Sequence, residues 1–153
     1  MADFGRQIAP APTDVKVVAP RAVVHGKQAQ IKVTATSRVG DAEGAKATLY
    51  WQSLTGTARP KKVDDVVLGK GGAGSFVAVP EKNGTWSVQV AGSWGRRAGE
   101  SEQVKTKVKF AVGRKSAVWS PNVNTLVPLT AMVDPAQAGV SVTLQRDRKS
   151  TRL

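Results

Sequence analysis

The stretch Gln28-Ala-Gln-Ile-Lys-Val-Thr-Ala-Thr-Ser37 alternates apolar and polar residues with a period of two. Successive side chains of a β-strand point to opposite faces of its sheet, so this alternation predicts a half-buried strand. The apolar face carries Ile31, Val33 and Ala35, and the opposite face carries Lys32, Thr34 and Thr36. This stretch sets the pattern for the rest of the chain.

Similar stretches recur, and no stretch shows a helical stripe. The further predicted strands are Val15–Ala19, Ala45–Gln52, Val63–Leu68, Ser75–Val79, Thr85–Gly92 and Val104–Val112. About seven short strands separated by turn residues are typical of an all-β fold, an antiparallel β-sandwich, with a small barrel as the alternative. Trp51 and Trp86 lie on apolar faces and are predicted core residues, and Asn83-Gly84 predicts a hairpin turn between two core strands.

Composition excludes several kinds of site. The chain has 153 residues and a net charge of +12, with no cysteine and a single histidine, His25. Disulfide frameworks, zinc–thiolate centres and thiol catalysis are therefore excluded. We predict no transmembrane span, because no run approaches the ~20 apolar residues that a bilayer requires, and the N-terminus has no signal-peptide pattern.

Short matches at a spacing of about 95 residues predict a repeat. Gly44-Ala-Lys-Ala-Thr-Leu49 returns as Gly139-Val-Ser-Val-Thr-Leu144, Val33-Thr-Ala35 as Leu129-Thr-Ala131, and Ala22-Val23 as Ala117-Val118. A period of this size is a whole domain. We therefore expect a flexible N-terminal segment over 1–13, a complete sandwich over 14–113, and a truncated second copy over 114–153.

The motifs Gly44-Ala-Lys-Ala-Thr-Leu-Tyr-Trp51 and Asn83-Gly-Thr-Trp86, with Ala19-Pro20 and Gly26-Lys27, resemble the bacterial Ig-like repeats of actinobacterial surface and secreted proteins. The resemblance implies an Ig-like β-sandwich that serves as a spacer or adhesive stalk among neighbouring repeats. It implies no catalytic residues. The last residues, Arg148–Leu153, resemble a translated sequencing adapter, and an ordinary basic terminus is the alternative interpretation.

Basic residues form the most regular candidate site. Lys105, Lys107 and Lys109 alternate along one predicted strand and would share a face, with ~6.5–7 Å between neighbours. Trp94, Arg96 and Arg97 lie in the preceding loop and would add an aromatic ring and two guanidinium groups. The functional interpretation is contact with a polyanion. The alternative is a solvated face whose lysines discourage edge-to-edge pairing of strands.

Other motifs do not predict chemistry. Gly69-Lys-Gly-Gly-Ala-Gly74 matches a nucleotide-binding pattern, but a strand, not a helix, is predicted after it. Asp64 and Asp65 are adjacent in a strand and point to opposite faces, so they do not converge as an acid–base pair. The expectation is therefore a protein that is not an enzyme, with no catalytic residue, metal or cofactor.

Together these features favour a non-enzymatic Ig-like spacer or adhesive module, part of a longer extracellular or cell-surface precursor. Its expected partners are an anionic cell-wall polymer or glycan and neighbouring Ig-like repeats. A basic β domain that binds nucleic acid is the alternative, and a phage Ig-like decoration module is a further one. Of the excess positive charge, +3 falls within Arg146–Leu153 and +8 within residues 1–113, which weakens the nucleic-acid interpretation.

Overall fold

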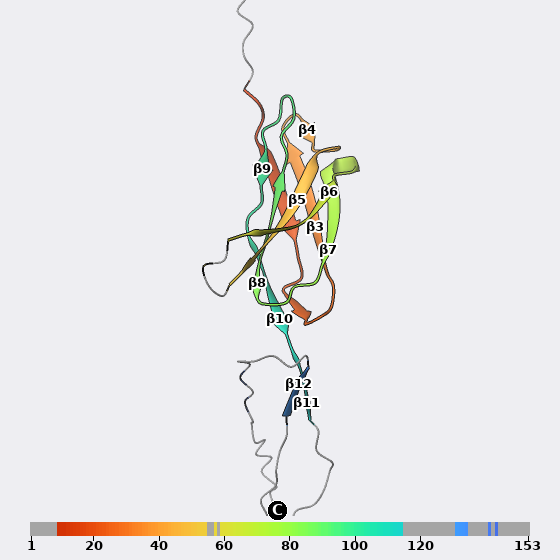
Figure 1. Cartoon of the computed structure of the whole chain (residues 1–153). Coiled ribbons are helices and arrows are strands. Elements are labelled where there is room, and N and C mark those ends of the chain that lie inside the picture. The colour runs from red at the N-terminus through yellow and green to blue at the C-terminus, as the bar shows by residue number, and fades with distance from the viewer. Residues whose placement is uncertain are drawn as a thin grey trace, which may run out of the picture. The chain divides into compact units, whose positions relative to one another are not determined.

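A computed structural model describes residues 9–54, 57, 59–114, 131–134, 141 and 143. The chain divides into two compact units, Met1–Lys109 and Phe110–Leu153. Figure 1 shows that the first unit consists of strands that run along its length.

The first sheet is built around β3. Its strands are β1 (Thr13–Val18), β3 (Ala29–Ser37), β4 (Gly40–Asp41) and β7 (Ala73–Ala78). β3 pairs antiparallel with β1 through Lys32–Ser37 and with β7 through Ala29–Thr34, and β4 folds back on the end of β3. A short 3-10 turn, η1 (Lys70–Gly72), precedes β7.

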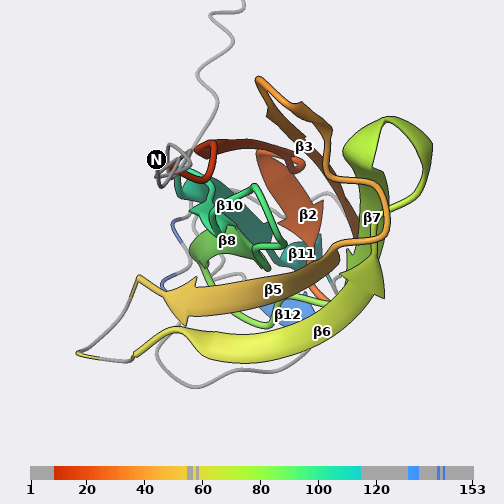
Figure 2. The same cartoon turned by 90° about the horizontal axis from the view of Figure 1, so that it is seen from above.

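The second sheet has the order β2-β10-β8-β5-β6, with β9 paired to the end of β8. Its strands are β2 (Ala22–Val24), β5 (Lys46–Ser53), β6 (Lys61–Val67), β8 (Gly84–Val90), β9 (Gly99–Glu100) and β10 (Val104–Lys109). Antiparallel pairing joins β10 to β8, β8 to β5 and β5 to β6, whereas β2 runs parallel to β10. Viewed from above, the strands of the two sheets enclose a common centre (Figure 2).

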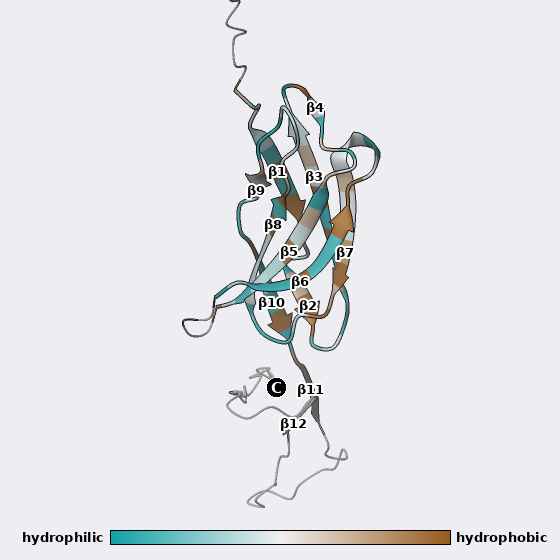
Figure 3. Cartoon of the chain, turned by 45° about the horizontal axis from the view of Figure 1, so that its top comes forward, coloured by the Kyte–Doolittle hydropathy of each residue, from teal (hydrophilic) through white to brown (hydrophobic). Residues whose placement is uncertain are grey.

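The core fills the space between these sheets. The first sheet contributes Ile31, Val33 and Phe76, and the second contributes Leu49, Trp86 and Val88, all of them buried. Apolar and polar residues alternate along several of these strands in Figure 3, because strands such as β3 and β10 bury one face and expose the other. The prediction of an all-β sandwich is confirmed, and a strand is present in each of the seven predicted stretches. The strand predicted over Val104–Val112 ends at Lys109, because Ala111–Arg114 belong to a separate strand of the second unit.

The two predicted core tryptophans contact each other. The ring centroids of Trp51 and Trp86 lie 4.1 Å apart with the rings tilted by 47°. Trp86 is buried, while Trp51 packs against the core with part of its surface exposed. Trp86 Nε1 donates to Thr106 Oγ1 at 3.0 Å, and that hydroxyl donates to the carbonyl of Pro20 at 2.7 Å. A buried donor is thereby satisfied, as a core tryptophan requires.

The predicted hairpin at Asn83-Gly84 is wrong. The strands on either side, β7 and β8, pair with β3 and with β5 respectively, so this connection passes from one sheet to the other. Asn83 holds the connection in place, because its Oδ1 accepts from the Val108 backbone N–H at 2.7 Å and its carbonyl accepts from Leu54 at 3.0 Å. The Asn-Gly pair therefore matches a hairpin-turn motif in sequence, but in the structure it holds the connection between the two sheets in place.

The second unit is described by one pair of strands. β11 (Ala111–Arg114) pairs antiparallel with β12 (Ala131–Asp134). The residues that carry the predicted repeat at Ala117-Val118 and Leu144, and the tail Arg148–Leu153, lie outside the described residues. The truncated second copy stays a prediction.

Candidate functional site

Three lysines form a row on the outer face of the second sheet. Lys105, Lys107 and Lys109 alternate with the buried Thr106 and Val108 along β10, so all three side chains are exposed on the same side. We call them the lysine row. At the spacing of a strand, the first and third lie about 13 Å apart. None of the ion pairs within the described residues involves these lysines.

Hydroxyl and amide groups lie beside the lysine row. Lys105 is the register partner of Thr85 on β8, and Thr85 in turn lies opposite Gln52 on β5. The next outward position on β8 is Ser87, opposite the half-buried Tyr50. Thr85 and Ser87 are buried, so a polymer lying across this face would meet the cations of β10 rather than these hydroxyl groups.

Two further basic residues join the lysine row through backbone contacts. Lys107 donates its N–H to the carbonyl of Arg21 at 2.9 Å, which places Arg21 at the outer edge of the row. The contact between Asn83 and Val108 brings the exposed Lys82 to the other edge. We call these five residues the basic cluster. Arg21 and Lys82 were not predicted to belong to it, because the contacts that bring Arg21 and Asn83, the neighbour of Lys82, to β10 join residues far apart in the sequence and no local pattern marks them.

A separate network of charges lies at the β6 edge of the same sheet. Asp65 Oδ2 lies 2.6 Å from Lys62 Nζ and 3.0 Å from Lys46 Nζ, and Asp65 Oδ1 accepts from Thr48 Oγ1 at 2.7 Å. The hydrogen bonds from Lys62 and then Thr48 hold the pKa of Asp65 well below its usual range. The same contact with Asp65 raises the pKa of Lys62. These lysines are already paired, so they contribute less attraction to an outside anion than the lysine row does.

The structure does not bring Trp94, Arg96 and Arg97 to the lysine row. Thr85, at the start of β8, pairs with Lys105, whereas Trp94 follows the other end of β8. The two groups therefore lie toward opposite ends of the sandwich, because the five residue steps from Thr85 to Val90, at the end of β8, already span about 17 Å (Figure 1). Arg96 is also only 8% exposed, and its Nη1 donates to the Asp41 carbonyl at 3.0 Å, so it has a structural role.

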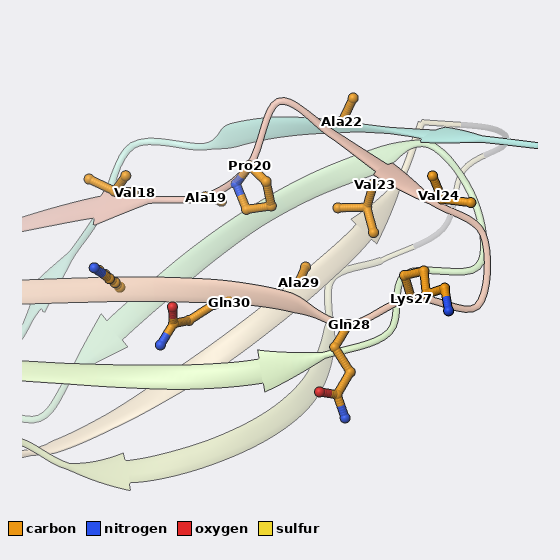
Figure 4. A pocket seen from close by; sticks show the side chains of 11 residues that line it. Val18, Ala19, Pro20, Ala22, Val23, Val24, Lys27, Gln28, Ala29 and Gln30 are labelled. Atoms are coloured by element: carbon orange, nitrogen blue, oxygen red, sulfur yellow. The ribbon is translucent and has the colours of Figure 1, made fainter.

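A groove lies where the chain crosses from one sheet to the other. After Val18 the chain leaves β3 and enters the second sheet as β2, so Ala29–Ile31 of β3 pair with β7 alone. The space beside them has a volume of about 540 Å³, and Figure 4 shows the side chains around it. We call it the crossover groove. Its lining is Val18, Ala19, Pro20, Ala22, Val23, Val24 and Ala29, with Lys27, Gln28, Gln30 and Lys32.

The remaining motifs lie in places that fit structural roles. In the glycine-rich stretch, Gly72 has a φ of +65°, and a Cβ there would come 2.0 Å from the Ala35 carbonyl oxygen. Strand β7 follows it, as predicted. Within the described residues, no group of three or more histidine, aspartate or glutamate side chains is placed to hold a metal ion. In the same ranges no helix has the length and apolar character that crossing a membrane requires.

Comparison with known proteins identifies the fold but no family. No protein-family model matches the chain, and no curated protein matches it significantly. A superoxide reductase (neelaredoxin) from Ignicoccus hospitalis aligns with a TM-score of 0.50 at 17% identity, covering 63% of this chain and 80% of its own. A variant of the same reductase gives a TM-score of 0.52, also at 17% identity, over 66% and 83%. The sulfur carrier protein SoxY from Chlorobium limicola gives 0.43 at 14% identity, over 61% and 74%.

The comparison corrects the prediction that the chain is not an enzyme. Over about two thirds of its length the chain is similar in fold to a superoxide reductase, which is an enzyme. The Ig-like resemblance implied no catalytic residues, but a fold by itself does not exclude catalysis. An identity of 17% shows a common fold alone, so we transfer no activity from these neighbours.

Proposed function

We propose that the chain contributes an Ig-like spacer or adhesive module of a bacterial surface or secreted protein, and that the lysine row contacts an anionic cell-wall polymer or glycan. The lysine row carries this proposal. It presents three aligned cations on an exposed sheet face, flanked by Arg21 and Lys82 and without an acidic partner in the described part of the chain. Unneutralised cations in a row attract a linear polyanion more than scattered ones do.

The path of the chain supports the spacer part of the proposal. β1 begins beside the β8–β9 loop, where the Arg97 N–H donates to the Ala11 carbonyl at 2.8 Å. β10 ends beside β2 at the other end of the sandwich, where Lys109 pairs with Val24. A module that is entered at one end and left at the other can be placed in series with neighbouring repeats.

The strand order supports the Ig-like part. β1-β3-β7 on one side and β2-β10-β8-β5-β6 on the other correspond to two sheets of a Greek-key sandwich, with the first strand divided between them. Trp51 lies on β5, the third long strand, which is where immunoglobulin domains place a core tryptophan.

A nucleic-acid-binding β domain is the alternative that the same lysines suggest. Proteins that bind single strands combine such cations with exposed aromatic platforms. On this face Tyr50 is half-buried and two strands from the lysine row, and Trp94 lies at the opposite end of the sandwich. The arrangement therefore favours an anionic polymer without stacking bases. A phage decoration module would have the same fold, and no contact described above favours it.

Equilibrium binding to three polymers at increasing salt separates these functions. The probes are poly(glycerol phosphate), single-stranded DNA of matched charge, and neutral dextran. We expect binding to poly(glycerol phosphate) that is at least as tight as binding to the DNA and that weakens steeply with salt, and no binding to dextran. Tighter binding to DNA by tenfold or more would favour the alternative, and equal binding to dextran would contradict a charge-based contact.

A further inference from the structure

The chain enters the first unit through β1 and leaves it through β10, and these strands run in the same direction. β1 follows Ala11, whose N–H donates to the Gly95 carbonyl at 2.9 Å, and β10 ends at Lys109 beside Val24 of β2. In Figure 4 the chain continues past Val18 into β2, which is parallel to β10. Tension between the two ends would therefore pull β1 and β2 against their own direction and pull β10 along its direction.

Every ladder that anchors these strands would be strained along the strand axis. β1 is paired with β3 over Thr13–Val18, β10 with β8 over Val104–Thr106, and β2 with β10 over Lys107–Lys109. The hydrogen bonds of a ladder run across its strands, so sliding one strand lengthwise stretches all of these bonds at once. Pulling a strand sideways from one end opens the bonds one after another, which requires less force.

The ladder between β2 and Lys107–Lys109 lies on both routes by which tension can open the unit. If β1 leaves β3 first, the tension passes directly from Ala22 on β2 to its partner β10. If β10 leaves first, it must slide past β2 as well as β8. We call β2 with Lys107–Lys109 the parallel pair. Neither route separates the two ends of the chain until the parallel pair breaks.

Hydrogen bonds fix both ends of the parallel pair. The Lys107 N–H donates to the carbonyl of Arg21, just before β2, at 2.9 Å. The N–H of His25, just after β2, donates to the Lys109 carbonyl at 2.8 Å. A slide of β10 past β2 by one residue step, about 3.3 Å, breaks both bonds together.

Buried groups reinforce this contact. Thr106, which is fully buried, donates its hydroxyl to the Pro20 carbonyl at 2.7 Å, and the Val108 N–H donates to Asn83 Oδ1 at 2.7 Å. Val108 is also the register partner of Val23, and both side chains are buried. Hydrogen bonds in such surroundings are stronger than bonds exposed to water, so they oppose the slide of β10.

We propose that the parallel pair makes the first unit resist stretching between the ends where the chain enters and leaves it. The inference rests on the spacer part of the proposed function, because a spacer joined in series transmits tension along the chain. Forced unfolding is governed by the barrier to opening and not by the free energy of unfolding. A ladder of only three register pairs can therefore dominate the resistance when it lies across the line of tension.

Force spectroscopy of single full-length chains in two pulling directions tests the proposal. The chain has no cysteine, so cysteines introduced at exposed positions provide the only attachment points. Pro10→Cys with Lys109→Cys stretches the unit end to end, and its unfolding releases up to about 350 Å of chain. Lys61→Cys with Lys109→Cys pulls across the strands of the second sheet, from β6 to β10. We expect end-to-end pulling to require several-fold more force.

His25→Pro tests the parallel pair itself. It removes the N–H that is donated to the Lys109 carbonyl, and Val24, which lies in a strand, accepts a following proline. At constant end-to-end force we expect this variant to unfold about two- to tenfold faster than the wild type. His25→Ala is the matched control, because it keeps the N–H and should unfold at the wild-type rate. Circular dichroism of each variant checks that the fold is retained.

Phe76→Leu separates this role from general stability. Phe76 is buried on β7, which pairs with β3, so the substitution should lower the urea midpoint of unfolding. The rate of unfolding under end-to-end force should stay within about twofold of the wild type, because the parallel pair breaks before β7 is disturbed.

Equal forces in the two pulling directions would overturn the proposal, even if His25→Pro fails to fold. Equal rates for His25→Pro and His25→Ala, or equal acceleration by His25→Pro and Phe76→Leu, would also overturn it. Lys105→Gln with Lys107→Gln changes exposed side chains of the lysine row, and it should weaken polymer binding without altering the rate under force. Failure of the mechanical role and failure of the polymer contact are therefore distinguished by separate measurements.

Discussion

Gly84 lies directly beneath the indole ring of Trp51. A Cβ atom at this position would come 2.2 Å from Trp51 Cζ2 and 2.6 Å from the Gln52 carbonyl oxygen. Both contacts are too close for any side chain, so the residue at the start of β8 must be glycine if the two tryptophans are to keep their packing. The local sequence suggested a turn glycine, whereas the structure shows a glycine required by close packing.

We expect Gly84→Ala to lower the free energy of unfolding by about 1–3 kcal/mol, because the methyl group forces Trp51 or the β5 backbone to move. Urea unfolding followed by tryptophan fluorescence measures the change. Gly69→Ala is the matched control, since a Cβ there meets only the Ala73 carbonyl oxygen at 3.7 Å, and its effect should stay within about 0.5 kcal/mol. Equal effects of the two substitutions would contradict this packing role.

Thr106 links Trp86 to the chain crossover at Pro20. Because Trp86 Nε1 is buried and donates to Thr106 Oγ1, Thr106→Val should leave that donor without an acceptor. The expected loss of stability is about 1–3 kcal/mol. Thr34→Val changes an exposed threonine on β3 and should have little effect, within about 0.5 kcal/mol. A Thr106→Val protein as stable as the wild type would show that this hydrogen bond contributes nothing.

The pKa of Asp65 predicts a pH dependence. Its pKa is lowered in the folded chain, so its ion pairs stabilise the fold fully above about pH 5, where the carboxyl group is ionised even in the unfolded chain. This stabilisation is lost as the pH falls through about 4 and below. We expect Asp65→Asn to be less stable than the wild type at pH 7, and the difference to shrink progressively as the pH is lowered from about 4 toward 2. Denaturant unfolding across this range measures it, and a difference that grows on acidification would contradict the assignment.

At the scale of elements, alternation of apolar and polar residues was sufficient to predict the long strands. β3 buries one face, and its apolar residues recur every second position for that reason. β8 keeps the same alternation in sequence, although all of its residues except Gln89 are buried. β2, β4 and β9 were not predicted, because each has only two or three residues and shows no period. Their positions depend on partners distant in sequence, as β2 depends on β10.

Pairing between elements also explains which part of the candidate site was predictable. The lysine row lies on a single strand, so local alternation was enough to place its side chains on one face. The prediction that Trp94 and Arg97 lie with that row was wrong, because their position depends on the path of the loop after β8, and local sequence patterns do not determine that path. Arg21 and Lys82 join the lysines only through contacts between strands and loops, for the same reason.

At the scale of the whole molecule, the basic residues fall into two groups, those that form ion pairs and those that do not. Lys46 and Lys62 are paired with Asp65 at one edge of the second sheet, while the basic cluster at the other edge has no ion pair within the described residues. Trp94 projects from the end where β1 begins, far from these cations. The first unit thus places its unpaired cations and its exposed tryptophan toward opposite ends.

The affinity of a lysine-row variant for an anionic polymer tests the central claim most directly. Lys105, Lys107 and Lys109 are replaced with glutamine, and the control variant replaces Lys32, Lys61 and Lys70, which are exposed elsewhere on the described surface and are in none of its ion pairs. Both variants lose the same charge, so only position distinguishes them. We expect the lysine-row variant to bind poly(glycerol phosphate) at least about tenfold more weakly than the control, with a slope of log affinity against log salt that is smaller by about 2–3. Equal affinities and equal slopes for the two variants would contradict the proposal that the lysine row is the contact surface.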